Sequence, residues 1–314
     1  MDLDKARILV TGASGFVGRN VVQLMRDRGL QPVTPSRSAF NLLEQAAVRR
    51  MLEETKPDVV FHLAGLIGGI GANKARPADF CYENLLMGTV MLHESWRAGA
   101  RKYVTLMGGC SYPAHAPSPI KETELFNGMP QAESAPYSLA KAMSAIQAEA
   151  YRRQHQFDAI VLVPGNLYGP FDNFDLNNSH VIPALIRKYV EAKKTGRKEI
   201  VAWGTGRPTR DFVYVEDACR VILKAAGEYS GSEIINISSG RPVSIRELTE
   251  TVAELVGYDG KVVWDSSKPD GQMFKGFDVT RMKTLLGCDC PTTLRSGLEK
   301  TIAWFLSNPA EIRL

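Results

Sequence analysis

The chain has 314 residues, of which 44% are hydrophobic and 23% are charged, and its formal net charge is +4. These values are ordinary for a globular protein, so they exclude a disordered or collagen-like chain, and the weak positive charge gives no argument for nucleic-acid binding. Five cysteines are too few for a disulfide framework. The N-terminus lacks an apolar signal region and no run of about 18 apolar residues follows, so we expect a cytoplasmic protein with no membrane anchor.

Short apolar runs alternate with helical stretches along the first half of the chain. Strands that are apolar throughout, separated by helices, are typical of a parallel sheet covered on both faces. We therefore predict an α/β protein with a Rossmann-type doubly wound parallel sheet. A second strand is expected to end near residues 33–37. The other strands are predicted at residues 7–10, 59–63, 102–106, 159–163 and 234–237, and the helices at 17–28, 46–55, 85–98 and 138–154.

The pattern loosens after about residue 165, where Pro, Gly and Asn cluster and shorter helices are expected at residues 244–256 and 294–306. This part of the sequence predicts a smaller, mixed α/β C-terminal lobe that binds the substrate. We expect the first lobe to contain residues 1–166 with further segments near 212–240, and the second lobe to contain residues 167–211 and 241–314.

A glycine-rich turn follows the first predicted strand and opens the first predicted helix. Gly12, Gly15 and Gly18 would permit a tight turn, close approach of a pyrophosphate and close packing of helix on strand. The amides and the positive dipole end of the helix N-terminus would then face that anion. The segment predicts a dinucleotide-binding site, and the alternative is a turn selected for packing alone.

The end of the second predicted strand points to the choice of cofactor. An NAD site usually carries Asp or Glu there, to accept a hydrogen bond from the ribose 2′-hydroxyl. This sequence offers Ser36 and Arg37 instead. Because a guanidinium group can bind a 2′-phosphate through two hydrogen bonds, we expect NADP(H) rather than NAD. The alternative is that Arg37 is an ordinary solvated loop residue.

Tyr137 and Lys141 stand four residues apart at the start of a predicted helix, so they share one helix face. A free tyrosine has a pKa near 10, roughly, and is a poor acid–base group at neutral pH. We expect the neighbouring lysine ammonium to lower the pKa of the phenol. The same lysine could bind the nicotinamide ribose.

With these motifs the sequence resembles the extended short-chain dehydrogenase/reductase family and, within it, the GDP-L-fucose synthases. The resemblance covers nearly the whole chain. It is most specific at Cys110-Ser111-Tyr112-Pro113 and Ser179-His180-Val181-Ile182-Pro183, and it extends to residues 68–73, 166–174, 203–206, 210–212 and 267–271.

The resemblance implies an NADPH-dependent enzyme that epimerises a GDP-4-keto-6-deoxy sugar at C3 and C5 and reduces its C4 ketone. Tyr137 matches the acid that protonates the C4 oxygen, and Lys141 matches the lysine that holds the ribose. Cys110 and His180 match the acid–base pair for C3 and C5, whose protons are acidified by the adjacent ketone. Taken alone, Cys110 would more often be a small buried hydrophobe and His180 a structural residue.

The resemblance also implies two sets of binding residues, no metal site and a homodimer formed through the helices predicted at residues 85–98 and 138–154. Trp203 is equally compatible with packing between the lobes. The GDP-linked 4-keto sugar would contact Asn166, Lys188, Trp203, Arg210 and Lys261. The cofactor would contact Gly12, Ala13, Ser14, Gly15, Phe16, Val17, Gly18, Arg37, Asn41, Leu42, Leu63, Ala64, Leu106, Met107, Gly108, Tyr137, Lys141, Pro164, Gly165, Asn166, Leu167 and His180.

One position departs from the family pattern. The family has a serine two residues before the cysteine, and its hydroxyl binds the C4 oxygen, whereas this chain has Gly108. Ser111, Thr105 or a water could replace that donor. The departure keeps open a variant GDP-sugar 4-reductase or a 3,5-epimerase that lacks the other step. A third alternative is a protein that binds NADP but is not an enzyme. The presence of Tyr137, Lys141, Cys110 and His180 argues against it.

Overall fold

The computed structural model describes residues 1–176, 178–267, 270 and 272–313. Its centre is a five-stranded sheet in which every neighbouring pair is parallel, as the sequence predicted. The strands are almost completely buried because helices cover both faces. In order across the sheet they are β1 (Ile8–Thr11), β2 (Val59–His62), β3 (Lys102–Leu106), β4 (Asp158–Pro164) and β9 (Ile235–Ile237).

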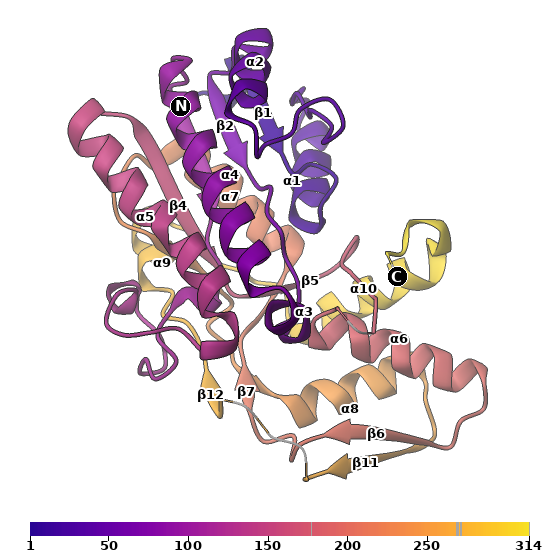
Figure 1. Cartoon of the computed structure of the whole chain (residues 1–314). Helices are drawn as coiled ribbons and strands as arrows, with labels where there is room; N and C mark the ends of the chain where they lie inside the picture. The colour runs from indigo at the N-terminus through magenta and orange to yellow at the C-terminus, as the bar shows by residue number, and fades with distance from the viewer. Residues whose placement is uncertain (177, 268–269, 271, 314) are drawn as a thin grey trace.

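Two layers of helices enclose this sheet, and Figure 1 shows them on either side of the strands. Each layer closes its own cluster of buried apolar side chains. One face carries α1 (Phe16–Asp27), α7 (Val215–Glu228) and α9 (Thr280–Leu286), and the other carries α2 (Gln45–Thr55), α4 (Pro77–Arg97) and α5 (Ala135–His155). Met282, Leu286 and Cys290, from near the end of the chain, complete the first of these clusters.

The strand expected to end near residues 33–37 is reduced to a single parallel bridge between Val33 and Leu9. The Val33 amide donates to the Ile8 carbonyl at 2.8 Å, and the Val33 carbonyl accepts from the Val10 amide at 2.9 Å. Prolines at positions 32 and 35 flank this residue. Because Pro35 has no amide hydrogen, it cannot donate the next bond to β1, and the ladder ends after Val33.

α4 begins at Pro77, eight residues before the start that the sequence predicted at residue 85. Proline is favoured in the first turn of a helix, where its missing amide hydrogen costs no bond. The extra turns carry Phe80 and Asn84, whose side chains are buried. They therefore belong to the part of α4 that reaches the carboxyl end of the sheet.

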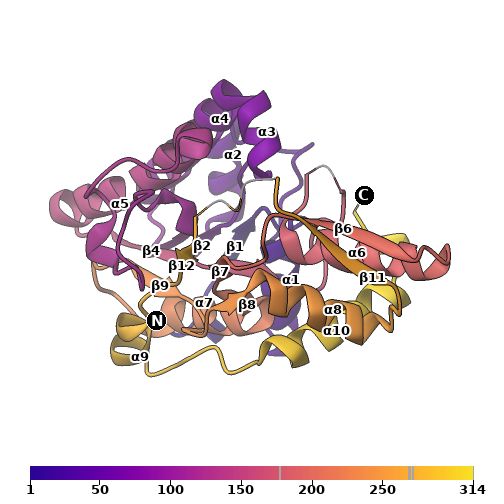
Figure 2. The same cartoon turned by 90° about the horizontal axis from the view of Figure 1, so that it is seen from below.

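A second group of elements lies below the sheet in Figure 1 and is seen from underneath in Figure 2. Its helices share a third apolar cluster, which includes Tyr189, Leu248 and Ile302. The helices are α6 (Val181–Lys194), α8 (Ile245–Val256) and α10 (Leu294–Ser307), and the short α3 (Ile70–Ala75) lies beside α4, as Figure 2 shows. The strands pair as β6 (Glu199–Trp203) with β11 (Lys261–Asp265), β7 (Thr209–Arg210) with β10 (Val243–Ser244) and β12 (Phe274–Lys275), and β5 (Asn166–Tyr168) with β8 (Phe212–Tyr214).

The carboxyl ends of all five central strands point toward this second group of elements. In open parallel sheets ligands bind at that edge, next to the strand where the order of connection reverses. Here that strand is β1, which has the Val33 bridge on one side and β2 on the other. Within the part of the chain that the structure describes, no helix has the length and apolar character needed to cross a membrane.

Candidate active site

The glycine-rich turn after β1 forms a cradle that larger residues would fill. Gly12 has a φ of +75°, and a Cβ atom there would lie 2.5 Å from the Ala64 nitrogen. A Cβ atom at Gly18 would lie 2.0 Å from the Gly12 carbonyl oxygen. Close packing of helix on strand therefore requires these glycines, and it brings the amide end of α1 to the edge of the sheet. A pyrophosphate fits such an end.

The other residues expected at the cofactor lie on loops at this same edge. Leu63 and Ala64 follow β2 and contact Gly12. Leu106, Met107 and Gly108 end or follow β3, and residues 164–167 end β4 and form most of β5. Asn41, Leu42 and Arg37 lie between Val33 and α2.

Arg37 is exposed, and it forms no ion pair with any residue that the structure describes. Two hydroxyl groups accompany it: the Ser36 Oγ lies 3.0 Å from the Ser38 Oγ and accepts from the Ala39 amide. A guanidinium with two neighbouring hydroxyls is chemically suited to a phosphate monoester. The residues present on this loop and on the glycine turn therefore fit NADP(H).

Gly108 brings the two expected reaction centres together. A Cβ atom at Gly108 would lie 3.0 Å from the Cys110 sulfur and 3.7 Å from the Tyr137 hydroxyl oxygen. The thiol and the phenol therefore flank the same piece of backbone. This arrangement needs the sharp turn after β3, where the 3₁₀ turn Gly109–Ser111 follows Gly108.

The acid–base properties of this site differ from the sequence-based expectation. Burial raises the pKa of the Tyr137 phenol, with the nearby Cys110 charge as a second cause. The pKa of Tyr137 is therefore displaced in the direction opposite to the one expected from Lys141, because burial disfavours the charged phenolate. Burial also lowers the pKa of Lys141 to about 8. A phenol that keeps its proton is the form that an acid catalyst requires.

His62 is a neighbour of this pair that the sequence did not indicate. Its Nδ1 lies 2.9 Å from the Thr11 hydroxyl oxygen. Burial, with the Lys141 charge as a lesser cause, lowers the pKa of His62 to about 3. The imidazole is therefore neutral at physiological pH and adds no charge next to Lys141.

Neither side-chain hydroxyl proposed to replace the missing serine is available. Thr105 donates its hydroxyl to the His62 carbonyl at 3.2 Å, and Ser111 donates to the Ser138 carbonyl at 2.9 Å. Each hydroxyl has a single hydrogen, and that hydrogen is already used in a buried bond to a backbone carbonyl. The C4 oxygen would therefore depend on Tyr137 or on water.

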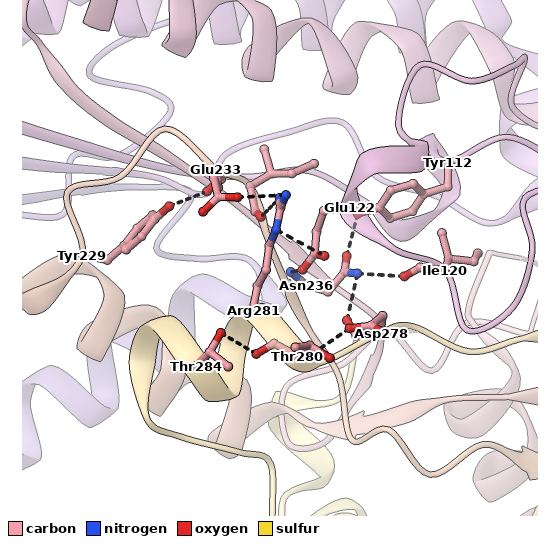
Figure 3. A network of polar contacts seen from close by, with 11 residues as sticks. Tyr112, Ile120, Glu122, Tyr229, Glu233, Asn236, Asp278, Thr280, Arg281 and Thr284 are labelled. Atoms are coloured by element: carbon pink, nitrogen blue, oxygen red, sulfur yellow. Dashed lines mark hydrogen bonds and ion pairs between the residues drawn. The ribbon is translucent and has the colours of Figure 1, made fainter.

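A buried network fixes the segment that follows Cys110, as Figure 3 shows. The Tyr112 hydroxyl donates to the Asn236 side chain at 2.6 Å. The Asn236 amide in turn donates to the carbonyls of Ile120 and Asp278, each at 3.0 Å. Glu122 accepts from the Asn236 backbone amide at 2.9 Å, and burial raises the pKa of its carboxyl group. The network thus ties the Cys110 turn to β9.

Phe277 completes this support and was not identified from the sequence. A Cβ atom at Gly109 would lie 2.5 Å from its ring, and one at Gly165 would lie 3.4 Å from it. The ring therefore fills the space between the turn after β3 and the loop after β4. Only glycine fits at position 109, which gives that residue a packing role.

His180 is the residue that immediately precedes α6. Its side chain is exposed, yet the surrounding protein lowers the pKa of its imidazole by desolvation. Its neighbour Ser179 lies against the loop before α3, since a Cβ atom at Gly69 would be 3.5 Å from the Ser179 carbonyl oxygen. The structure thus places His180 across the edge of the sheet on the second group of elements.

Arg210, one of the residues expected at the substrate, has a second cation beside it on the neighbouring strand. Arg210 on β7 is paired in register with Lys275 on β12, and burial lowers the pKa of both side chains. The charges of Cys110 and Arg210 act on the Lys275 ammonium in opposite directions, Cys110 raising its pKa and Arg210 lowering it. The sequence analysis did not identify Lys275 as a site residue. The motif at residues 267–271, just before it in the chain, was the signal that could have indicated it.

The remaining substrate candidates are spread more widely. Trp203 ends β6 with 71% of its surface exposed, and Lys188 is exposed on α6. Lys261 begins β11, whereas Trp203 is opposite the last residue of that strand, about 13 Å further along. The structure therefore does not bring Lys261 to Trp203. Asn166 uses its amide to donate to the Asp211 carbonyl at 2.9 Å. Lys268, Pro269 and Gly271 of the 267–271 motif lie outside the described residues.

Comparison with known proteins agrees with this geometry. A model of the NAD dependent epimerase/dehydratase family matches residues 8–238. The chain is 41% identical over 304 residues to GDP-L-fucose synthase 1 of Arabidopsis thaliana, covering 96% of this chain and 94% of that one. It is 37% identical to the GDP-L-fucose synthase of Escherichia coli K12, covering 99% and 100%. A GDP-L-fucose synthetase structure from Naegleria fowleri bound to NADP has a TM-score of 0.92 at 27% identity, covering 99% of this chain and 96% of that one.

Proposed function

Because the chain belongs to the NAD dependent epimerase/dehydratase family, we propose that it is an NADPH-dependent enzyme of the GDP-L-fucose synthase kind. It would epimerise a GDP-4-keto-6-deoxy sugar at C3 and C5 and reduce its C4 ketone. The observation that carries this proposal is the convergence of the Cys110 thiol and the Tyr137 phenol beside Gly108, at the carboxyl edge of a dinucleotide-binding sheet.

The reductive step uses the phenol and the lysine. NADPH supplies, when bound, the hydride that is added to C4. Tyr137 gives its proton to the C4 oxygen, so the ketone becomes an alcohol and the phenol becomes a phenolate. Lys141, with a pKa of about 8, is mostly an ammonium at pH 7 and stabilises that phenolate. Water then returns the proton to Tyr137.

The epimerising steps use the thiol and the imidazole. A C4 ketone delocalises the carbanion at C3 or C5 as an enolate, which makes these carbon-bound protons removable. We assign Cys110 and His180 to the two faces of the sugar, one removing a proton and the other delivering one. Arg210 and Lys275 supply the positive charge for the diphosphate, and Lys188 and Trp203 are assigned to the rest of the GDP-sugar.

The narrower alternatives each use part of this set. A 4-reductase alone would need Tyr137 and Lys141, and a 3,5-epimerase alone would need Cys110 and His180. The presence of both pairs favours the combined reaction. We also propose the lobe division given by the sequence, with cofactor on residues 1–166 and 212–240 and substrate on residues 167–211 and 241–314, and a cytoplasmic location.

Product analysis tests the function directly. The protein is incubated with GDP-4-keto-6-deoxymannose and NADPH in deuterated water, and the products are separated and examined by mass spectrometry and NMR. We expect loss of NADPH absorbance, deuterium at C3 and C5, and a 3,5-epimerised 4-alcohol. Reduction without deuterium would identify a 4-reductase, deuterium without NADPH oxidation would identify an epimerase, and neither would contradict the proposal.

Replacing Arg37 by alanine should weaken NADPH binding far more than NADH binding. The guanidinium is assigned to the 2′-phosphate, which NADH lacks. The two dissociation constants can be measured by nicotinamide fluorescence, and Arg50→Ala on the exposed side of α2 serves as the matched control. Equal losses for the two cofactors would remove Arg37 from the site.

We further propose a homodimer that forms through α4 and α5. Light scattering should give roughly twice the 34.6 kDa chain mass. A mass near that of one chain would contradict this assignment. The two helices pack on each other and share exposed apolar side chains that a second copy would cover: Tyr82, Leu85, Leu139, Met143 and Ile146.

A further inference from the structure

The loop between β2 and α3 contacts both catalytic ends of the site. A Cβ atom at Gly68 would lie 3.0 Å from the Phe80 ring, and that ring meets the Tyr137 ring edge to face with centroids 6.0 Å apart. A Cβ atom at Gly69, the next residue, would lie 3.5 Å from the Ser179 carbonyl oxygen. A short chain of contacts therefore runs from Tyr137 through residues 68–69 to the residue before His180.

Two buried asparagines hold this loop in place. Asn73 donates its side-chain amide to the carbonyls of Gly68 and Gly69, each at 3.0 Å. Asn84 accepts from the Leu66 amide at 3.1 Å and donates to the Leu66 carbonyl at 3.0 Å. The two side chains therefore bind the loop from both ends, one from α3 and one from α4.

Apolar burial contributes little to the position of the loop. Ile67 and Ile70, which flank the two glycines, are each 56% exposed. Gly68 and Gly69 have no side chains to bury. The hydrogen bonds of the buried Asn73 and Asn84 side chains are therefore the main constraint on where residues 66–69 lie.

We propose that Asn73 and Asn84 are positioning residues, which make the 66–69 loop a spacer that sets His180 relative to Tyr137. The inference rests on the proposed function, in which His180 exchanges carbon-bound protons and Tyr137 protonates the C4 oxygen. An enzyme that performs both steps on one bound sugar needs the two groups at a fixed separation, because a shift of about 1 Å can cost on the order of 100-fold in rate.

The test compares two reactions of the full-length protein. Deuterium exchange into GDP-4-keto-6-deoxymannose depends on His180, whereas oxidation of GDP-L-fucose by NADP⁺ depends on Tyr137 and needs no epimerisation. We expect Asn73→Ala to lower kcat for exchange by about 10- to 100-fold. KM, the oxidation rate and NADPH affinity should stay close to those of the wild-type protein. The hydrogen bonds between Asn84 and Leu66 and the contact of Phe80 with Tyr137 remain in this variant.

Two further variants keep the inference testable if Asn73→Ala is unstable. Gly69→Val keeps both asparagine bonds, and its extended backbone (φ −66°, ψ 178°) suits valine, but the side chain pushes on the Ser179 carbonyl. It should lower exchange selectively. Asn308→Ala is the matched control, since Asn308 donates to the Trp304 carbonyl four residues earlier, remote from the site. It should change neither rate.

Two results would overturn the inference. One is a parallel fall of exchange and oxidation in Asn73→Ala and Gly69→Val, which would indicate general damage. The other is unchanged exchange in both variants. Failure of the proposed function is distinguishable, because the wild-type protein itself would then lack exchange, oxidation or both.

Discussion

Replacing Tyr137 by phenylalanine is expected to lower NADPH-dependent reduction by roughly 10²–10⁴-fold, the usual contribution of a positioned general acid. The phenol keeps its proton because burial raises its pKa, and a phenylalanine ring in its place would have no proton to give. Deuterium exchange at C3 and C5 should remain largely intact, because carbon-bound protons are handled by Cys110 and His180. Stopped-flow absorbance and mass spectrometry on the same sample measure the two rates.

Tyr151→Phe is the matched control for this substitution. Tyr151 lies on the same helix, α5, and its hydroxyl pairs with the His93 ring at 2.6 Å, away from the sheet edge. It should change neither rate. If Tyr137→Phe removes exchange together with reduction, the phenol also serves the carbon protons and the division of roles is wrong.

Replacing Gly108 by serine is expected to raise the rate of C4 reduction, by up to about 10²-fold. The hydroxyl would add a donor for the developing charge on the C4 oxygen. Thr105 and Ser111 cannot supply one, because their hydroxyls already donate to backbone carbonyls. The new Cβ atom would lie 3.0 Å from the Cys110 sulfur, so the thiol must shift. We therefore expect exchange at the carbons to slow while reduction accelerates.

Gly108→Ala separates the hydroxyl from the crowding. It introduces the same Cβ atom without a donor, so it should slow exchange and give no gain in reduction. If serine and alanine behave alike, Tyr137 alone holds the C4 oxygen and the glycine is not a missing donor. If serine lowers activity on the natural sugar but raises it on GDP-4-keto-6-deoxymannose, Gly108 serves a different GDP-sugar.

The strands and the glycine turn could be predicted from the sequence because their signals are local. Residues 7–10, 59–63 and 102–106 are rich in apolar side chains, and parallel strands buried on both faces require that composition. The failures have equally physical causes. The strand expected to end near residues 33–37 is reduced to the Val33 bridge, because Pro35 lacks the amide hydrogen that the next bond of the ladder needs.

Residues of the site that depend on tertiary contacts could not be predicted. Phe277 and Lys275 reach the site through strand pairing between distant segments, which no local pattern shows. Lys261 and Trp203 were both assigned to the GDP-sugar by resemblance, and only the register of β6 and β11 shows that they lie at opposite ends of the ribbon. The direction of the Tyr137 pKa shift was not foreseen because it follows from burial, which the sequence does not reveal.

The residues of α9 that cover one face of the sheet are synthesised late, because they lie near the end of the chain. The face of the sheet that carries α1 and α7 is completed by Met282, Leu286 and Cys290. A nascent chain that has reached residue 240 has made every strand of the central sheet, yet it still lacks this cover and the Arg281 and Asp278 partners of the Asn236 network. Because this side of the sheet would stay partly uncovered, we expect stalled chains ending at residue 240 to remain protease-sensitive.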